Sequence, residues 1–245
     1  MSKGMASILA GKGVSQDKIS VIPIGFDGLQ TYGRNVDLTR DIMLENGIAG
    51  KFVVLYTGTM GHIMDIPTIL QAARITKDEP AIVYLFVGGG QNMERYKIQA
   101  DRDGLHCVFA GQCPKADIPL YCQQADVGLY PLRDGAVVAA LLGNKIFDYL
   151  GAGLPVIYSG PEGDAADLVR RSGGGICLQP GDSVGLASTL RELYANRVML
   201  REFGRSARSF IEKHCMTKDL MGQFEYTLRN MLETTRLRKT LGGDQ

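Results

Sequence analysis

Short apolar segments alternate with amphipathic segments along most of this 245-residue chain, and this alternation restricts the possible folds more than any other feature. The six apolar runs cover residues 52–57, 81–87, 106–110, 126–130, 154–158 and 175–178. Runs that are apolar throughout, and not only at alternate residues, are typical of strands buried on both faces. The sequence therefore predicts an α/β fold, a doubly wound parallel six-stranded Rossmann-like sheet with helices on both faces.

Amphipathic segments between and after these runs predict the helices. Asp65 and Asp164 are expected N-caps of two of them. The other expected helices cover residues 37–46, 92–103 and 116–123, and three more follow residue 182. Before the first run, the sequence predicts a short amphipathic helix over 2–10, a β-rich run over 18–23 that ends at Pro23, and a loop over 24–35. Such an opening resembles the end of a preceding domain more than the start of one.

Composition excludes several classes of protein. A net charge of +1 gives no argument for a nucleic-acid partner. The five cysteines include no CxxC pair and are odd in number, which favours thiols in a reducing compartment and a cytoplasmic location. No apolar run approaches the roughly 18 residues of a membrane span, and residues 1–20 are too polar for a signal peptide. No metal-ligand spacing, Ser/His/Asp order or pair of carboxylates stands out, so no catalytic residue is assigned.

Doubly wound sheets bind ligands beyond the carboxyl ends of their strands, which directs attention to five loops. These loops cover residues 58–65, 88–92, 111–115, 131–145 and 159–164.

The first of these loops contains Gly58 and Gly61, whose lack of side chains would let backbone N–H groups approach a phosphate. It is neither a GxGxxG fingerprint nor a P-loop. His62 follows, and both a ligand contact and a solvated loop residue are open interpretations. The glycines at 88–90 are more simply a tight turn than a dinucleotide loop.

Residues 143–158 combine a predicted helix start with charged side chains. Gly143 and Asn144 precede Lys145, and a helix N-terminus with a lysine beside it suits an anion. Asp148, one turn later, is placed to hold sugar hydroxyls. An ordinary helix–strand joint with a surface lysine is the alternative.

The order of these elements resembles the C-terminal, donor-binding domain of GT-B glycosyltransferases in the glycosyl transferases group 1 family. The resemblance covers about residues 18–230, and its strength lies in the order and spacing of nine individually weak stretches. These are KISVIPIGFD (18–27), VVLYTGTMG (53–61), TILQAA (68–73), YLFVGGG (84–90), VFAGQCP (108–114), IPLYCQQADVGLYP (118–131), NKIFDYLGAGLPVIYSG (144–160), GGGICLQPGD (173–182) and the helix that begins at Leu186. The NKxxDYLxAGxPV form is most similar to bacterial members that act on activated amino or deoxy sugars in surface-polysaccharide assembly.

This resemblance implies a UDP- or GDP-sugar donor, with no metal required and retention of anomeric configuration. Backbone amides near Gly143 and Lys145 would hold the phosphates, Asp148 the ribose, and the turn at 111–113 would border the base. The predicted nucleotide-sugar-binding residues are Gly58, Thr59, Gly61, His62, Gly88, Gly111, Gln112, Gly143, Asn144, Lys145 and Asp148.

The sequence also departs from the family pattern. The family has two glutamates separated by seven residues, and here Ala140 and Asp148 stand at those positions. The family's arginine and lysine after the first strand correspond to Thr59 and Met64. We hypothesise that Lys145 replaces one of these lost charges.

The resemblance divides the chain into three parts and makes it half of a GT-B fold. Residues 1–30 would be the remnant of an N-terminal domain with a crossover linker, 31–216 the nucleotide-sugar-binding domain, and 217–245 a return helix with a frayed tail. The expected partner is the missing N-terminal acceptor domain or a separate subunit, with peripheral contact at the inner membrane. A piece of a longer enzyme, one chain of a two-chain enzyme and a decayed fragment are all open.

The predicted function is the donor-binding part of a retaining glycosyltransferase that moves a hexose or amino sugar to a polysaccharide or lipid-linked acceptor. A non-catalytic nucleotide-binding scaffold is one alternative, consistent with Ala140. A GT-B sugar-nucleotide epimerase is another, although its acid–base carboxylates cannot be placed here. A nicotinamide-dependent oxidoreductase is excluded because the first strand lacks GxGxxG and the second lacks a terminal acidic residue.

Overall fold

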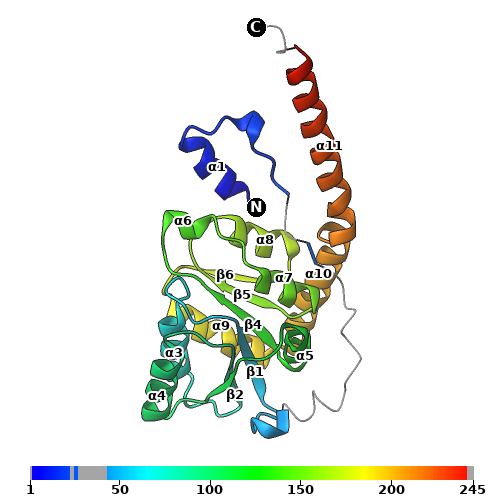
Figure 1. Cartoon of the computed structure of the whole chain (residues 1–245). Coiled ribbons are helices and arrows are strands. Elements are labelled where there is room, and N and C mark those ends of the chain that lie inside the picture. Colours follow the sequence, from blue (N-terminus) through cyan, green and yellow to red (C-terminus); the bar gives the residue numbers. More distant parts are fainter. Residues whose placement is uncertain (1, 23–24, 27–42, 242–245) are drawn as a thin grey trace.

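A computed structural model of the chain describes residues 2–22, 25–26 and 43–241, with side chains as far as residue 232. Six parallel strands form one sheet in the order β3-β2-β1-β4-β5-β6 (Figure 1). They are β1 (Phe52–Thr57), β2 (Ile82–Val87), β3 (Cys107–Gly111), β4 (Val127–Pro131), β5 (Val156–Ser159) and β6 (Gly175–Leu178). The predicted doubly wound α/β fold is therefore confirmed.

The central strands are buried along their whole length, as their continuous apolar runs predicted. Strand β1 pairs with β2 from Phe52↔Ile82 to Thr57↔Val87, and with β4 at Val54↔Val127. Successive connections run outward from β1 in one direction as far as β3, and then in the other direction from β4. The strand order therefore reverses between β1 and β4, where such folds open a crevice.

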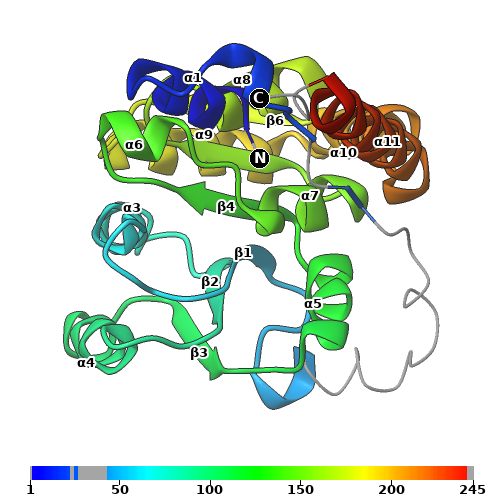
Figure 2. The same cartoon turned by 45° about the horizontal axis from the view of Figure 1, so that its top comes forward.

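Helices cover both faces of the sheet. Helices α3 and α4 lie on one side and α5 on the other (Figure 2), while α9 packs on α3, and α7 packs on α5 and α10. The described helices are α1 (Lys3–Gly11), α3 (Ile66–Ile75), α4 (Met93–Asp103), α5 (Ile118–Gln124), α6 (Ala136–Ala139), α7 (Asn144–Gly151), α8 (Asp164–Ser172), α9 (Ser183–Ala195), α10 (Arg197–His214) and α11 (Thr217–Leu241).

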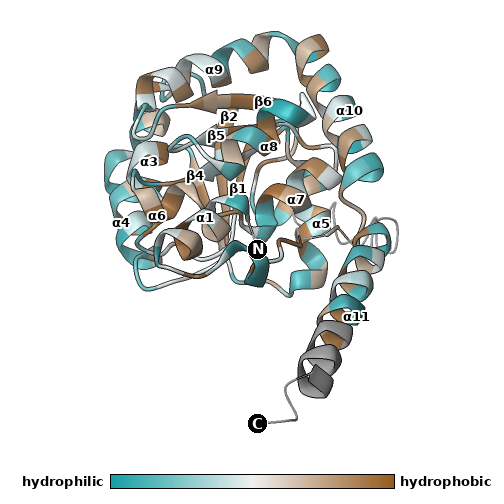
Figure 3. Cartoon of the chain, turned by 90° about the horizontal axis from the view of Figure 1, so that it is seen from above, coloured by the Kyte–Doolittle hydropathy of each residue, from teal (hydrophilic) through white to brown (hydrophobic). Residues whose placement is uncertain are grey.

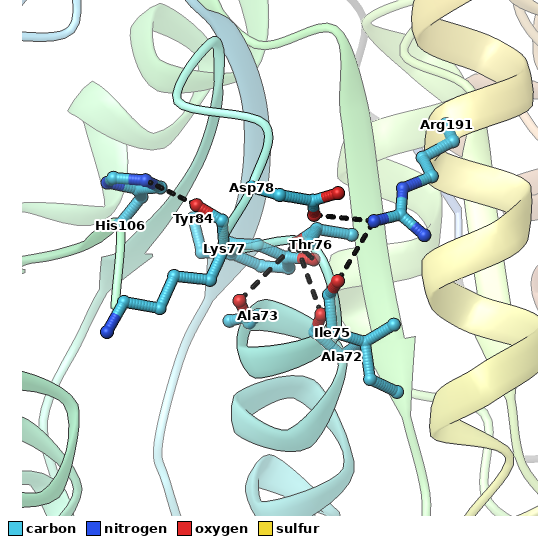
Figure 4. Close-up of polar contacts among 9 residues, drawn as sticks. All are labelled: Ala72, Ala73, Ile75, Thr76, Lys77, Asp78, Tyr84, His106 and Arg191. Carbon is cyan, nitrogen blue, oxygen red and sulfur yellow. Dashed lines mark hydrogen bonds and ion pairs between the residues drawn. The ribbon is translucent and has the colours of Figure 1, made fainter. Parts of the chain in front are cut away.

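A polar cluster joins α3, β2 and α9 at the edge where the strands begin (Figure 4). The Thr76 hydroxyl donates to the Ala72 carbonyl at 3.1 Å and lies 3.0 Å from the Tyr84 hydroxyl. Arg191 of α9 donates to the Ile75 carbonyl at 3.0 Å. These bonds satisfy polar groups at the end of α3.

The structure tests three expectations for the N-terminal part of the chain and contradicts the first of them. Lys18 belongs to a short 3-10 helix (Gln16–Lys18), and residues 19–22 form no strand, so the predicted β-rich run is wrong over its described part. The expected helix over 37–46 is helical at 43–45, and residues 37–42 lie outside the described part. Asp65 is the N-cap residue of α3 as expected, although its carboxylate accepts from the Thr68 hydroxyl at 2.6 Å and makes no bond to a backbone N–H of the helix.

Helix α1 lies against the loops at the carboxyl edge, above α6 (Figure 1). The Ser2 hydroxyl donates to the Ala140 carbonyl at 2.5 Å, and the Gly4 N–H donates to the Asp164 carboxylate at 2.7 Å. Gly163, and not Asp164, is the N-cap of α8. The predicted N-cap role of Asp164 is therefore wrong, because its carboxylate binds the first turn of α1.

Helix α11 extends away from the rest of the fold (Figure 3). Leu220 at its start is buried, whereas Phe224 is 41% exposed and Leu228 is 43% exposed. The base of the helix is held by Phe26, whose N–H donates to the Cys215 carbonyl at 2.7 Å.

Over the described residues, no helix combines the length and apolar character needed to cross a membrane.

The packing of β4 against α7 gives a testable prediction. A Cβ on Gly128 would lie 2.6 Å from Cδ2 of Tyr149, a fully buried ring. We expect Gly128→Ala to lower the free energy of unfolding by about 1–3 kcal/mol because the ring cannot move away. Chemical denaturation measures the change. Gly222→Ala on α11, where a Cβ meets nothing within 4 Å, is the control. Equal stability of the two variants would contradict the packing described.

Candidate functional site

A cavity of about 660 Å³ opens at the carboxyl ends of β1 and β4, where the strand order reverses. Three segments form most of its wall: the end of β1 with the loop after it, the end of β4, and the start of α7. The lining residues are Thr57, Gly58, Thr59, Gly61, Ile63, Met64, Ile118, Tyr130, Leu141, Leu142, Gly143, Asn144, Lys145 and Asp148. This is the position at which doubly wound sheets bind ligands.

A larger hollow of about 750 Å³ lies at the opposite edge, between the loop before β5 and α10. Its acidic residue, Asp126, is already used: the carboxylate accepts from the Val53 N–H at 2.8 Å and pairs with Arg197 at 2.5 Å. The smaller cavity is therefore the candidate ligand site, because it lies at the carboxyl ends of the strands, where doubly wound folds bind ligands.

The glycine at the end of β1 allows Lys145 to approach the strand. Gly58 has φ +110, and a Cβ there would lie 3.3 Å from Cε of Lys145 and 3.4 Å from its Nζ. Gly88 supports this loop from the neighbouring strand, since a Cβ on it would lie 2.1 Å from the Gly58 carbonyl oxygen. Both positions therefore require glycine, for conformation and for close approach.

Lys145 reaches from α7 across the cavity to the end of β1. Its Nζ lies 4.8 Å from the centre of the Tyr56 ring, 5.5 Å from the centre of the Tyr130 ring and 3.5 Å from Sδ of Met64. Within the described part of the chain it forms no ion pair. Burial lowers the pKa of Lys145 to about 8. An ammonium group that faces aromatic rings and sulfur, without a carboxylate, is ready to receive an anion.

The start of α7 supplies further anion donors. Gly143 is the N-cap and no side chain caps the helix, so the N–H groups of the first turn have no partner within the helix. The Gly143 N–H itself donates to the Tyr130 hydroxyl at 3.0 Å. The unpaired N–H groups, the helix dipole and Lys145 favour the same ligand charge.

Asp148 lies one turn further along α7 and also lines the cavity. Burial raises the pKa of its carboxyl, and the positive charge of Lys115 opposes this shift. The carboxylate adds a hydrogen-bond acceptor to a site otherwise composed of donors.

Seven of the predicted binding residues line this cavity, namely Gly58, Thr59, Gly61, Gly143, Asn144, Lys145 and Asp148. The other four, His62, Gly88, Gly111 and Gln112, do not. The exposed His62 ring has a nitrogen 2.5 Å from Nε2 of Gln91. The Gly111 carbonyl accepts from the Gly88 N–H at 2.6 Å, and the Gln112 side chain lies against Gly89. Ligand contact by any of the eleven stays a prediction.

Ala140, which stands at the family's first glutamate position, is buried and does not line the cavity. Its carbonyl accepts from Ser2, and a Cβ on Gly4 would lie 2.9 Å from its methyl group. Helix α1 therefore fills the space in front of this position. At the family's lysine position, Met64 instead contacts the Lys145 ammonium.

Sequence reasoning did not identify Tyr56 and Tyr130 as part of the site, because both stand inside apolar runs that read as core. The tyrosine hydroxyls could have indicated a role outside the core. A buried hydroxyl needs a hydrogen-bond partner, and the end of a strand is where backbone groups are free to bind it.

No three histidine, cysteine or acidic side chains gather into a possible metal site within residues 2–22, 25–26 and 43–232. The metal-independence implied by the resemblance stays a prediction.

The low pKa of Lys145 predicts a dependence of stability on pH. An unfolded lysine has a pKa of about 10.4, so between about pH 8 and pH 10 the unfolded state binds more protons and the free energy of unfolding rises with pH. We expect Lys145→Met to stabilise the protein by about 1–3 kcal/mol at pH 7. This advantage should shrink as the pH rises above 8.

Denaturant titrations at pH 7 and pH 9.5 measure this difference, with Lys97→Met on the exposed face of α4 as the control. A loss of stability in Lys145→Met, or a gain that does not change with pH, would contradict the description of Lys145 as a half-buried cation without an ion pair among the described residues.

Comparisons with known proteins agree with this fold. A family model described as "Glycosyl transferases group 1" matches residues 51–196. "Probable glycosyltransferase WbjE" of Pseudomonas aeruginosa is 24% identical over 192 residues, which are 77% of this chain and 46% of that protein. "Putative colanic acid biosynthesis glycosyl transferase WcaI" of Escherichia coli K12 is 24% identical over 182 residues, 73% of this chain and 43% of that protein. The chain thus spans less than half the length of these two curated relatives.

Among solved structures, Anabaena HepE in complex with UDP-glucose superimposes with a TM-score of 0.82 at 20% identity, covering 94% of this chain and 62% of that chain. At this identity the superposition establishes the fold. Because the family model matches more than half of the sequence, from before β1 to the end of α9, the chain belongs to the glycosyl transferases group 1 family and has the fold of a GT-B glycosyltransferase domain.

Proposed function

We propose that this chain is the nucleotide-sugar donor-binding part of a retaining glycosyltransferase. The observation that carries the proposal is the half-buried Lys145 ammonium, which forms no ion pair with a described residue and lines the same cavity as the uncapped start of α7, at the sheet's switch point. HepE, whose fold this chain shares, was crystallised with UDP and with UDP-glucose. Such a donor has a charged diphosphate between a nucleoside and a sugar, and the cavity carries a positive wall.

The charged and polar groups of the cavity are complementary to those of a UDP- or GDP-sugar. In this proposal, Lys145 and the first N–H groups of α7 hold the diphosphate. Asp148 accepts hydrogen bonds from the ribose hydroxyls, and the turn at 111–113 borders the base. Gly58 and Gly61 let the backbone of the first loop approach the phosphates.

The reaction follows from the same charges. When the sugar leaves the donor, negative charge grows on the departing diphosphate, and groups that bind it more strongly at that moment lower the barrier. Lys145 and the α7 amides supply this stabilisation without a metal. The sugar, a hexose or amino sugar, passes to a polysaccharide or lipid-linked acceptor that a second domain holds.

Helix α11 is the proposed contact with that second domain. Its exposed apolar side chains recur at helical spacing, at Met221, Phe224, Leu228 and Met231. The predicted cytoplasmic location, with peripheral contact at the inner membrane, belongs to this proposal as well.

A non-catalytic nucleotide-binding scaffold is the second candidate. The observation in its favour is Ala140, which is covered by α1 where the family has a glutamate. Nucleotide binding is common to both candidates, and sugar transfer separates them.

Binding of uridine nucleotides tests the proposal first. We expect UDP and UDP-GlcNAc, or else GDP, to raise the melting temperature in a thermal-shift panel, and NAD to leave it unchanged. By calorimetry, Lys145→Ala should weaken nucleotide diphosphate binding at least severalfold, since a charge-assisted contact is lost. Lys97→Ala is the control. No shift with any nucleotide, or unchanged affinity of Lys145→Ala, would contradict the proposal.

Transfer tests the role of α11. Sugar transfer should require an N-terminal acceptor half supplied as a second chain. The double substitution Phe224→Asp with Leu228→Asp should abolish this transfer and leave UDP affinity unchanged, because no residue of α11 is among those that line the cavity. Transfer by the chain alone, or unimpaired transfer by the double variant, would show that α11 is not the contact.

A further inference from the structure

Two buried tyrosines stand behind the candidate donor site, on neighbouring strands of the sheet. Tyr56 belongs to β1 and Tyr130 to β4, and they are 1% and 2% exposed. The proposed function assigns no role to either of them, although both lie where the strand order reverses.

The rings of both tyrosines contact the same cation. The Lys145 Nζ lies 4.8 Å from the centre of the Tyr56 ring and 5.5 Å from that of Tyr130. Both distances are within the range at which an aromatic face attracts an ammonium group. Because Lys145 forms no ion pair with a described residue, the rings and Sδ of Met64 are what hold its head group in place.

The hydroxyls of the same two tyrosines bind the backbone on either side of the cavity. Tyr56 donates to the carbonyl of Thr59, in the glycine loop after β1, at 2.8 Å. The N–H of Gly143, the N-cap of α7, donates to the Tyr130 hydroxyl at 3.0 Å. A Cβ on Gly143 would lie 2.9 Å from that hydroxyl, so the contact also depends on glycine.

We propose that Tyr56 and Tyr130 are positioning residues of the donor site. Each supports Lys145 with its ring, and each fixes one of the two backbone segments that face the diphosphate with its hydroxyl. The inference rests on the proposed function, because it assigns the site a diphosphate ligand.

A buried tyrosine elsewhere in the sheet provides the comparison. Tyr84 on β2 is also 1% exposed, and its hydroxyl lies 3.0 Å from that of Thr76, at the opposite edge of the sheet (Figure 4). Its loss removes the same kind of core side chain without touching the cavity. Tyr84→Leu therefore reports the effect of destabilisation alone.

The test is a double-mutant cycle on UDP affinity, measured by calorimetry at a temperature where every variant is folded. Tyr56→Leu and Tyr130→Leu should each weaken UDP binding by about three- to tenfold, the size of a partly desolvated cation–π contact. In a Lys145→Met background, Tyr130→Leu should weaken UDP binding by a smaller factor than it does in the wild type, because only the support by its hydroxyl is left to lose. Uridine, which lacks the diphosphate, should bind all these variants alike, and Tyr84→Leu should bind UDP as the wild type does.

If the leucine variants do not fold, two variants at position 130 that keep the shape of the ring provide a second test. Phenylalanine and trifluorophenylalanine at position 130 both lack the hydroxyl and fill nearly the same space, but fluorine withdraws electron density from the ring face. We expect UDP to bind the fluorinated protein more weakly than the Tyr130→Phe protein, by about two- to fivefold.

The possible results separate the inference from the proposed function. If the wild-type chain binds no nucleotide diphosphate, both are overturned. If UDP binds and Lys145→Met weakens it, the proposed function stands. Tyrosine variants that then bind like the wild type, losses that add in full to that of Lys145→Met, or equal affinities of the Phe and fluorinated proteins would overturn the positioning role.

Discussion

The ammonium group of Lys145 lies in the cavity between the two halves of the sheet and contacts residues of both. The Lys145 side chain extends from α7, which follows β4 in the chain, and its ammonium group contacts the ring of Tyr56 on β1. The contact is possible because Gly58 has no side chain and because the rings of Tyr56 on β1 and Tyr130 on β4 both lie within reach of this ammonium group. The arrangement depends on the strand order, since β1 and β4 are neighbours only where the winding reverses.

This contact does not stabilise the fold in the way a salt bridge between protein groups would. Removing an ammonium group from water costs free energy, and the aromatic faces return only part of it. Burial therefore lowers the pKa of Lys145 to about 8, and the site retains an unsatisfied positive charge at neutral pH. A bound anion would remove that cost, so a local loss of stability and a gain of anion affinity would be two consequences of one arrangement.

The sheet could be predicted from the sequence because continuous apolar runs have few alternatives in a chain with helices between them. The position of Lys145 and Asp148 at the cavity could be predicted from another pattern, a lysine and a carboxylate at an expected helix start in the loop region that follows a strand. Tyr56 and Tyr130 did not stand out, because their rings match the core and only their hydroxyl and cation contacts in three dimensions reveal them. Contacts between distant segments could not be predicted from the sequence either. Helix α1 covers Ala140, and the carboxylate of Asp164 binds the N–H of Gly4 although 160 positions separate the two.

The most direct test of the central claim is the change in backbone amide chemical shifts of the chain as UDP is added. The account predicts the largest shifts at Gly58, Asn144 and Lys145, where the glycine loop and the start of α7 face the same cavity. It predicts little change at Gly153 and Gly204, beside the hollow at the opposite edge. Shifts concentrated at that opposite edge, or no shifts at saturating UDP, would contradict the claim that Lys145 marks a nucleotide diphosphate site.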